Sequence, residues 1–366
     1  MKVKFGIDNL KEVKREGKVG MYTNISGVTS RWERSVDIIK PDVIFTGEHG
    51  YYEEYQPGEK YYNYRDAFLS VPVVTVYRKA DVEELSKISL LYVDIQDAGV
   101  RTFTYLSNLF RLIKESVKNS YKVVVLDRPN PLSGSNSFGS VSAESEVDVL
   151  APFLPFVYPF TIGELALYYG DRLSTEVEVV KMSNYSRDMY YGDTGLPFSS
   201  PSPNLSTEQS IYLYPALVLL EGFKVSIGRG TQKPFRLIGA PYLGETELYT
   251  FVKSLRIDGL LVKPAVFIPT DNVFKGERCC GVEFFVNDVR KFPFMKLAFY
   301  LVDFFTRVSA PLVAFANRRE GGNFIELLYN KKILSDVRSA GVEKFYEDEY
   351  RKGKAFLSDA SKYFIY

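Results

Sequence analysis

The N-terminal third of the chain alternates short apolar runs with segments of helical spacing. The apolar runs lie at 18–23, 43–45, 73–77, 90–95 and 122–126. The segments of helical spacing lie between them, at 30–39, 81–87 and 102–118. Short apolar runs bounded by polar residues predict buried strands, and strands that alternate with helices favour a parallel sheet with right-handed crossovers. We therefore expect a Rossmann-like α/β domain in this part of the chain.

The length of the chain predicts a second domain, because 366 residues exceed one ordinary core. The stretch 132–160 is rich in Ser, Gly and Pro, which is typical of a crossing between domains. We assign 1–145 to the Rossmann-like domain and 146–366 to a second α/β (α+β) domain, with a cleft between them. The second domain should hold strands near 177–181, 261–268 and 282–286 and helices near 208–220, 294–306 and 324–357.

The charge balance argues against a polyanionic partner. Lys and Arg number 46 and Asp and Glu 45, which leaves a net charge of +1. A protein that binds nucleic acid usually carries a basic face, so we expect no nucleic-acid partner. Aromatic residues reach 15%, including 27 Tyr. Tyr side chains either line a sugar or peptide groove or fill cores and rims, and composition alone does not choose between these roles.

The chain has few residues that could hold a metal ion. His49 is its one histidine, and its two cysteines, Cys279 and Cys280, are adjacent. Neighbouring cysteines rarely have the geometry for a disulfide with each other, so we expect two buried thiols and no Cys/His metal site. The sequence also lacks the Gly-rich fingerprints G-x-G-x-x-G and G-x-x-x-x-G-K-[ST]. We therefore expect neither a metal ion nor a cofactor.

The N-terminus shows no targeting signal. Met1–Gly6 lacks the apolar core of 7–15 residues that a signal peptide needs. The chain also has no run of about 18 apolar residues, so no membrane span is expected. These observations favour a cytoplasmic protein that does not associate with membranes. They leave open whether it forms a homo-oligomer.

Glu48 and His49 are the first candidates for chemistry. They follow the predicted strand 43–45 within Thr46-Gly47-Glu48-His49-Gly50, where the flanking glycines let the backbone turn sharply. The carboxyl end of a strand is the place where open α/β sheets bind ligands. The following stretch 51–66 is dense in Tyr and Glu and lacks periodicity. Long loops of this kind are often functional.

Polar residues also follow the other predicted strands. Because parallel strands end at one edge of the sheet, the side chains that follow them should gather there. The residues concerned are Asn24, Asp94, Gln96, Asp97, Asp127, Arg128 and Asn130, with Arg101 close behind. Their clustering favours a site over the chance polarity of loops.

Two loops of the second half add further candidates. Ser226–Thr231 is Gly-rich around Arg229, and its backbone N–H groups with the guanidinium could bind a carboxylate or phosphate. The proline-stiffened Pro201–Asn204 loop presents Asn204. Thr161 and Glu164 have capping-box spacing, so Glu164 has a structural role and is left out of the catalytic set.

A series of motifs in fixed order carries a family resemblance. They are Gly-Glu-His-Gly (47–50), Asp-Ile-Gln-Asp-Ala-Gly-Val-Arg (94–101), Thr104-Tyr105, Leu-Asp-Arg-Pro-Asn-Pro (126–131), Thr-Ile-Gly-Glu-Leu (161–165), Asp-Thr-Gly-Leu-Pro (193–197), Pro-Ser-Pro-Asn (201–204), Leu-Glu-Gly (220–222) and Gly-Arg-Gly-Thr (228–231). The set resembles the exo-β-N-acetylmuramidase (NamZ-type) glycosidase family, formerly a domain of unknown function. The resemblance covers nearly the whole chain. It implies removal of terminal N-acetylmuramic acid from peptidoglycan fragments, with Glu48 as a leading catalytic carboxylate.

The chain departs from the family pattern at three places. Phe138 and Ile227 stand where the family usually has Glu, and Val157-Tyr158-Pro159 stand where it commonly has Arg-His-Gly. Two carboxylates and an Arg-His pair are therefore missing from their usual positions, which marks a divergent member.

The leading hypothesis is a glycosidase that acts on a terminal N-acetylated or acidic sugar. Glycoside hydrolysis commonly uses two carboxylates that flank the scissile bond. Glu48 would be the general acid, His49 would orient it or bind substrate, and Asp97 or Asp127 would be the second carboxylate. Arg101, Arg128 and Arg229 are candidates for the substrate carboxylate. Asn24, Asn130, Asn204 and Thr231 complete the predicted substrate contacts.

Two rival hypotheses remain. The departures at Phe138 and Ile227 favour a non-catalytic sugar-binding protein on the same scaffold. A nucleotide-dependent enzyme at the sheet edge is weaker, because the Gly-rich fingerprint is absent.

Overall fold

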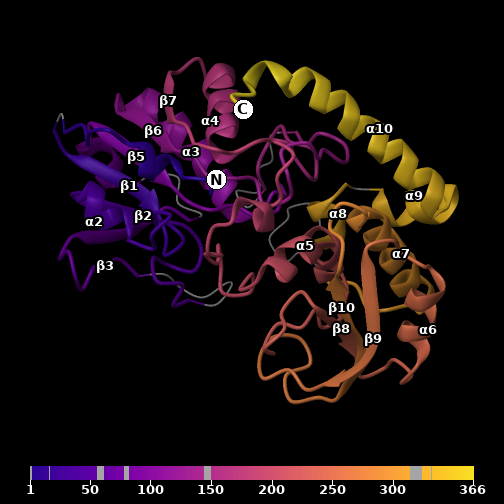
Figure 1. The fold of residues 1–366 in the computed structure, drawn as a ribbon. Coiled ribbons are helices and arrows are strands. Elements are labelled where there is room, and N and C mark those ends of the chain that lie inside the picture. Colours follow the sequence, from indigo (N-terminus) through magenta and orange to yellow (C-terminus); the bar gives the residue numbers. More distant parts are fainter. Residues whose placement is uncertain are drawn as a thin grey trace. The chain divides into compact units, whose positions relative to one another are not determined.

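A computed structural model describes residues 2–15, 17–55, 62–77, 82–143, 150–313, 324–330 and 332–366 (Figure 1). The chain divides into two compact units. The first comprises residues 1–203 together with 352–366, and the second comprises residues 204–351. This division differs from the boundary expected after residue 145, because the chain stays in the first unit for a further helix and strand.

The first unit is built on a seven-stranded sheet of order β3-β4-β2-β1-β5-β6-β7. Its strands are β1 (Val19–Thr23), β2 (Val43–Thr46), β3 (Tyr64–Arg65), β4 (Pro72–Thr75), β5 (Leu90–Asp94), β6 (Lys122–Leu126) and β7 (Val177–Val180). All neighbours pair in parallel except β3, which lies antiparallel on the edge beside β4. The predicted Rossmann-like parallel sheet is confirmed.

The strand order contains a topological switch point between β1 and β5. From β1 the chain builds outward through β2 and β4, and then returns to place β5, β6 and β7 on the other side of β1. This is the order of a doubly wound α/β sheet. Loops diverge at such a point, and the crevice outside the carboxyl ends of the two central strands is where such sheets bind ligands.

The central strands are buried along their whole length. Every residue of β1, β2 and β5 is buried, which explains why their sequences are continuous apolar runs. The helical segments of this unit are α1 (Gly6–Asn9), α2 (Ser35–Ile39), η1 (Glu83–Lys87), α3 (Thr104–Asn119), α4 (Ile162–Leu173), η2 (Tyr191–Thr194) and η4 (Ser361–Tyr363). Leu106, Leu109 and Ile113 form part of the buried face of α3, and this helix packs against α4 and β6.

The predicted strand 177–181 is β7, and it belongs to the first sheet instead of beginning the second domain. It pairs in parallel with β6 from Val123↔Val177 to Leu126↔Val180. The Pro-rich stretch before it stays in the same unit, since Val157 bridges both Val100 and Phe138. Proline punctuation therefore marks an ordered connection here and not a domain crossing.

The second unit is a smaller α+β fold. Its antiparallel sheet has the order β8-β10-β9. The elements are α5 (Glu208–Leu217), η3 (Val218–Gly222), β8 (Leu237–Ala240), α6 (Glu247–Ser254), β9 (Leu260–Phe267), β10 (Cys279–Val286), α7 (Phe294–Arg307), α8 (Phe324–Leu328), α9 (Ile333–Ala340) and α10 (Val342–Ala360). Helix α10 carries the chain from residues of the second unit to residues of the first. Cys279 and Cys280 are free and buried on β10, as predicted.

Some predicted elements differ in extent. The helix expected at 30–39 begins only at Ser35, because Trp32 adopts a left-handed backbone with φ 69° and is half exposed. The predicted cap Asp81 lies outside the described residues, and η1 begins at Glu83. Within the described part of the chain, no helix has the length and apolar character needed to cross a membrane. The cytoplasmic location stays a prediction.

Candidate active site

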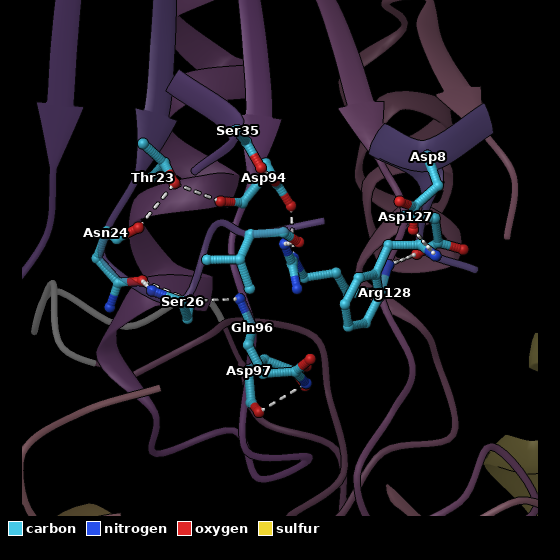
Figure 2. A network of polar contacts seen from close by, with 12 residues as sticks. Asp8, Thr23, Asn24, Ser26, Ser35, Asp94, Gln96, Asp97, Asp127 and Arg128 are labelled. Carbon is cyan, nitrogen blue, oxygen red and sulfur yellow. Dashed lines mark hydrogen bonds and ion pairs between the residues drawn. The ribbon is translucent and has the colours of Figure 1, made fainter. Parts of the chain in front are cut away.

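The parallel register brings several polar side chains to one edge of the first sheet. Thr23 at the end of β1 pairs with Asp94 at the end of β5, and Thr46 at the end of β2 pairs with Thr75 of β4. Figure 2 shows side chains that follow β1, β5 and β6 gathered beyond the arrowheads. Asn24, Ser26, Gln96 and Asp97 lie there at the switch point, with Asp127 and Arg128 after the next strand.

Glu48 is half-buried just beyond β2, and both of its carboxylate oxygens accept hydrogen bonds. The Tyr77 hydroxyl donates to Oε1 at 3.1 Å, and the Thr104 hydroxyl donates to Oε2 at 3.0 Å. Thr104 is the first residue of α3, so the carboxylate lies at a helix N-terminus, which favours negative charge. The main-chain oxygen of Glu48 accepts the Tyr105 hydroxyl at 2.7 Å. These hydrogen bonds fix the side chain and the main chain of Glu48 against the start of α3.

Gly47 permits this approach of the strand end to α3. A Cβ at this position would lie 2.5 Å from the Tyr105 ring, closer than side chains pack. Only glycine lets the backbone of this loop pass so close to the helix.

His49 closes the loop that begins at Glu48. Its ring is buried, and Nδ1 lies 2.8 Å from the Tyr55 carbonyl oxygen, while the Tyr55 N–H donates to the His49 carbonyl at 3.2 Å. His49 also has a left-handed backbone with φ 78°. These contacts join the two ends of the segment 49–55. His49 therefore stabilises the closed conformation of this loop.

Asn24 links the switch point to this loop. Its Nδ2 donates to the Tyr105 hydroxyl at 3.3 Å, to Glu53 Oε1 at 3.4 Å and to the Pro201 carbonyl at 3.1 Å. Its Oδ1 accepts the Ser26 N–H at 2.9 Å. Asn24 itself is fully buried, so its side chain holds the loop and helix together.

Glu53 is a carboxylate of this site that the sequence analysis did not single out. It is half-buried and has a left-handed backbone with φ 61°. Burial, followed by the neighbouring Glu54, raises its pKa to about 8. The one feature of the sequence that could have pointed to Glu53 is its position in the Tyr- and Glu-rich loop, five residues after Glu48.

Arg128 and Asp94 form a buried ion pair behind the edge. Arg128 Nε donates to Asp94 Oδ1, and Nη2 donates to the Val28 carbonyl at 2.6 Å. The guanidinium also lies 4.2 Å from the Phe5 ring centroid. Both partners are almost completely buried, and the Thr23 hydroxyl donates to the Asp94 carbonyl at 2.6 Å. These contacts of Arg128 hold together the backbone around the switch point.

Asp97 lies in the turn after β5 and is buried. It accepts the Tyr158 hydroxyl on Oδ2. Burial raises the pKa of Asp97 to about 7, although this hydrogen bond acts in the opposite direction. Tyr158 belongs to the stretch that we expected to depart from the family pattern, and it contacts a predicted catalytic carboxylate.

Asp127 is surrounded by donors. Gly163 N–H and Arg128 N–H donate to Oδ1 at 2.7 Å and 2.9 Å, and the Thr161 and Tyr366 hydroxyls donate to Oδ2 at 2.9 Å and 2.6 Å. Thr161 and Gly163 begin helix α4, where the predicted capping box of Thr161 and Glu164 is confirmed. Burial nevertheless raises the pKa of Asp127 to about 7. Its oxygens support the start of α4.

Arg101 and Asn130 hold the Pro-rich connection in place. Arg101 Nη1 donates to the Ser140 carbonyl at 2.7 Å. Asn130 Nδ2 donates to the carbonyls of Tyr158 and Phe160, each at 2.9 Å. Both side chains are buried. Their hydrogen bonds to main-chain carbonyls stabilise the loops next to the carboxyl ends of the sheet strands.

Asn204, Arg229 and Thr231 belong to the second unit. Arg229 donates from Nε and Nη2 to Glu221 Oε1, at 3.0 Å and 2.6 Å. The Thr231 hydroxyl donates to the Gly228 carbonyl at 2.6 Å and forms the turn of the Gly-rich loop. Asn204 is half-buried. The charge of Arg229 is thus balanced by a carboxylate of the same unit.

The two apolar residues that we expected to replace a family Glu, Phe138 and Ile227, are buried. Phe138 is 5% exposed and Ile227 3% exposed. Phe138 forms a β-bridge with Val157, and the Ile227 carbonyl accepts the Phe235 N–H at 2.9 Å. Each residue packs in the interior of its own unit.

The doubly wound sheet with carboxylates at its switch edge is the architecture of an α/β enzyme domain. Two family models match the chain. The exo-β-N-acetylmuramidase NamZ N-terminal model covers residues 19–209, and the C-terminal model covers residues 212–366. The chain belongs to the exo-β-N-acetylmuramidase NamZ family and is, by this membership, a glycoside hydrolase.

Individual relatives agree with this membership. The chain is 34% identical to the peptidoglycan β-N-acetylmuramidase NamZ of Bacillus subtilis (strain 168), over 100% of this chain and 92% of that protein. Its fold matches crystal structures of two DUF1343 family proteins from Bacteroides fragilis NCTC 9343. The TM-scores are 0.86 and 0.77, at 27% and 25% identity, over 100% of this chain and 99% of each solved chain.

Proposed function

We propose that this protein removes terminal N-acetylmuramic acid from peptidoglycan fragments by hydrolysis of the β-glycosidic bond. The name of its Bacillus subtilis relative supports this substrate class. The observation that carries the proposal is the position of Glu48, a half-buried carboxylate beside the topological switch point with two hydroxyl donors directed at its oxygens. We propose no metal ion or cofactor for the reaction.

Glu48 acts as the general acid in this proposal. A general acid gives its proton to the leaving glycosidic oxygen and becomes negatively charged as the bond breaks. The hydroxyls of Tyr77 and Thr104 and the N-terminus of α3 are already directed at the oxygens on which this charge develops. Donors fixed in advance stabilise a transition state without reorganisation.

Asp97 and Asp127 are less suited to act as the second carboxylate than the sequence suggested. Both are buried, and four donors converge on Asp127 alone. A carboxylate that activates a nucleophile must present a free oxygen to it. We therefore propose that these two residues stabilise the loops that follow β5 and β6.

The residues predicted to contact the substrate fall into a buried group and a more exposed group. Arg101, Arg128, Asn130 and Asn24 are buried and hold parts of the first unit, so we propose that they position the site. Arg229, Asn204 and Thr231 are more exposed, and they remain our proposed contacts to the carboxylate and hydroxyl groups of the sugar.

The test is release of a terminal sugar from two matched disaccharides, one with N-acetylmuramic acid and one with N-acetylglucosamine at the non-reducing end. We expect release of N-acetylmuramic acid and little release of N-acetylglucosamine. Glu178 is exposed and forms an ion pair with Lys14. Glu178→Gln is therefore a control that should keep full activity. Thermal stabilisation by the disaccharide without any release would contradict hydrolysis and favour a sugar-binding protein.

A further inference from the structure

We propose that Glu53 is the second catalytic carboxylate of this site, which accepts the proton of the attacking nucleophile while Glu48 protonates the leaving oxygen. This inference rests on the glycosidase function proposed above. It assigns a role to a residue outside the motifs that carry the family resemblance.

The loop geometry brings Glu53 back toward the sheet. The two contacts between His49 and Tyr55 close the segment 49–55 on itself. Within it, both His49 and Glu53 adopt the left-handed backbone that disfavours most side chains, at φ 78° and 61°. Such conformations persist only where surrounding contacts hold them, and they concentrate at functional sites.

Glu53 and the main chain of Glu48 are connected through Asn24 and the Tyr105 hydroxyl. The Tyr105 hydroxyl donates to the Glu48 carbonyl at 2.7 Å and accepts from Asn24 Nδ2 at 3.3 Å. The same Nδ2 lies 3.4 Å from Glu53 Oε1. The charges of Glu53 and Glu48 both act to raise the pKa of Tyr105, which places both carboxylates around that ring. Three short contacts therefore connect the two residues.

The surroundings of Glu53 differ from those of Glu48. Burial and the neighbouring charge of Glu54 raise the pKa of Glu53 to about 8. Among the residues that the structure describes, the titratable groups whose charges couple to Glu53 are Glu54 on its own loop and Tyr105 on α3, and neither supplies a positive charge. A carboxylate of raised pKa is a stronger base than an ordinary one, and general bases work best when their pKa is near the working pH.

The proposed step balances in protons and electron pairs. The bond between the anomeric carbon and the leaving oxygen breaks, and that oxygen keeps the electron pair and takes a proton from Glu48. The nucleophile forms the new bond to the anomeric carbon and loses its proton to Glu53. It is either a water molecule, which loses an O–H proton, or the acetamido oxygen of the sugar, whose amide loses its N–H proton. In both cases Glu48 loses one proton to the leaving oxygen and Glu53 gains one proton from the nucleophile.

The test compares Glu53→Gln, Glu48→Gln and the control Glu54→Gln on two N-acetylmuramides, one with a nitrophenyl and one with a sugar leaving group. Exposed Glu54 is the adjacent carboxylate, and its glutamine keeps an oxygen for the Tyr52 N–H. A nitrophenolate leaves without protonation, so loss of the general acid should affect mainly the sugar substrate. Loss of the base should affect both substrates alike, by about 100-fold or more in kcat/KM.

The pH profile gives a second readout. On the nitrophenyl substrate, which needs no general acid, kcat/KM of the wild-type protein should rise with pH through a midpoint near the pKa of Glu53, about 8, because Glu53 must be ionised to act. Glu53→Gln should lose this rise, and Glu54→Gln should keep it with a midpoint at lower pH, because the charge of Glu54 helps to raise the pKa of Glu53. Glutamine removes a buried ionisable group, so Glu53→Gln should remain folded at pH 8 by circular dichroism. Glu53→Asp, which retains a shortened carboxylate, should recover part of the activity.

The outcomes separate the two proposals. If the wild-type protein releases sugar and folded Glu53→Gln matches it on both substrates and in pH profile, the role of Glu53 is wrong and the glycosidase function stands. If the wild-type protein releases no sugar from either substrate, the proposed function fails and the role of Glu53 falls with it.

Discussion

The Tyr366 hydroxyl donates to Asp127 Oδ2 at 2.6 Å and joins residues 239 positions apart. The same hydroxyl accepts the Met182 N–H at 2.7 Å. Nearby, the Ile365 N–H donates to Glu164 Oε1 at 2.9 Å. The segment after α10 therefore docks at the start of α4, where Asp127 also lies. This relationship makes Asp127 a structural centre of the first unit.

Tyr366→Phe tests this docking. The variant keeps the ring and removes the hydroxyl, so Asp127 loses a donor and the Met182 N–H loses its acceptor. We expect unfolding to become easier by about 1–2 kcal/mol, measured by urea denaturation. Tyr363→Phe removes an exposed hydroxyl that bonds Asp171, and it should change the stability less. Equal effects of the two variants would contradict a special role for the Tyr366 contact.

Arg128→Lys tests the buried pair at the switch point. Lysine keeps the charge but cannot donate to Asp94 and to the Val28 carbonyl in the geometry of a guanidinium. A damaged buried ion pair leaves a poorly compensated charge, and we expect a loss of about 2–4 kcal/mol in the free energy of unfolding. Arg278→Lys, in an exposed pair with Glu245, should have little effect. An unchanged urea midpoint in Arg128→Lys would refute the structural assignment.

Asp97→Asn tests the effect of burial on ionisation. Burial raises the pKa of Asp97 from 3.8 to about 7, so the folded protein binds an extra proton between these values. The stabilisation is complete below pH 3.8 and is lost as pH rises through about 7. Asparagine abolishes this dependence and still accepts from Tyr158. Relative to wild type, the variant should gain on the order of 1–3 kcal/mol of stability between pH 5 and pH 8.

Urea denaturation at several pH values measures this difference. Asp258→Asn, which changes an exposed carboxylate, should show no such gain. A stability difference between Asp97→Asn and wild type that stays constant with pH would mean that Asp97 is ionised throughout.

His49→Asn and His49→Ala test the loop closure. Asparagine tolerates the left-handed backbone seen at φ 78° and offers a side-chain donor, whereas alanine does neither well. We expect His49→Ala to lower kcat/KM about tenfold or more, because a misplaced catalytic group costs rate even without unfolding. His49→Asn should retain more activity and keep the rise of kcat/KM with pH. If His49→Ala has wild-type kinetics, the loop needs no histidine to hold it.

Much of the first sheet could be predicted from the sequence, because its central strands are buried on both faces. Val19–Thr23, Leu90–Asp94 and Lys122–Leu126 are short apolar runs that have few alternatives to a strand. The alternation with helices then predicted their parallel order. The membership of β7 in the first sheet was not predictable in this way. A Pro-rich connection has the same composition whether the chain leaves a unit after it or folds back onto the same unit.

The candidate site was only partly predictable for a similar reason. Polar residues after strands are readily found, and Glu48 was among them. Sequence alone does not show which of these side chains bond to the protein itself, as Asp127 does to helix α4. Glu53 escaped notice because its position depends on a left-handed backbone and on the contacts between His49 and Tyr55, and neither leaves a local pattern in the sequence.

The most direct test of the account is kcat/KM of Glu48→Gln for release of N-acetylmuramic acid from a disaccharide. Glutamine keeps the size of the side chain and one acceptor oxygen, but it has no acidic proton to give. The account predicts a fall of about 100- to 10,000-fold, with the loss largely relieved on a nitrophenyl substrate. A folded Glu48→Gln protein that cleaves the disaccharide at the wild-type rate would contradict it.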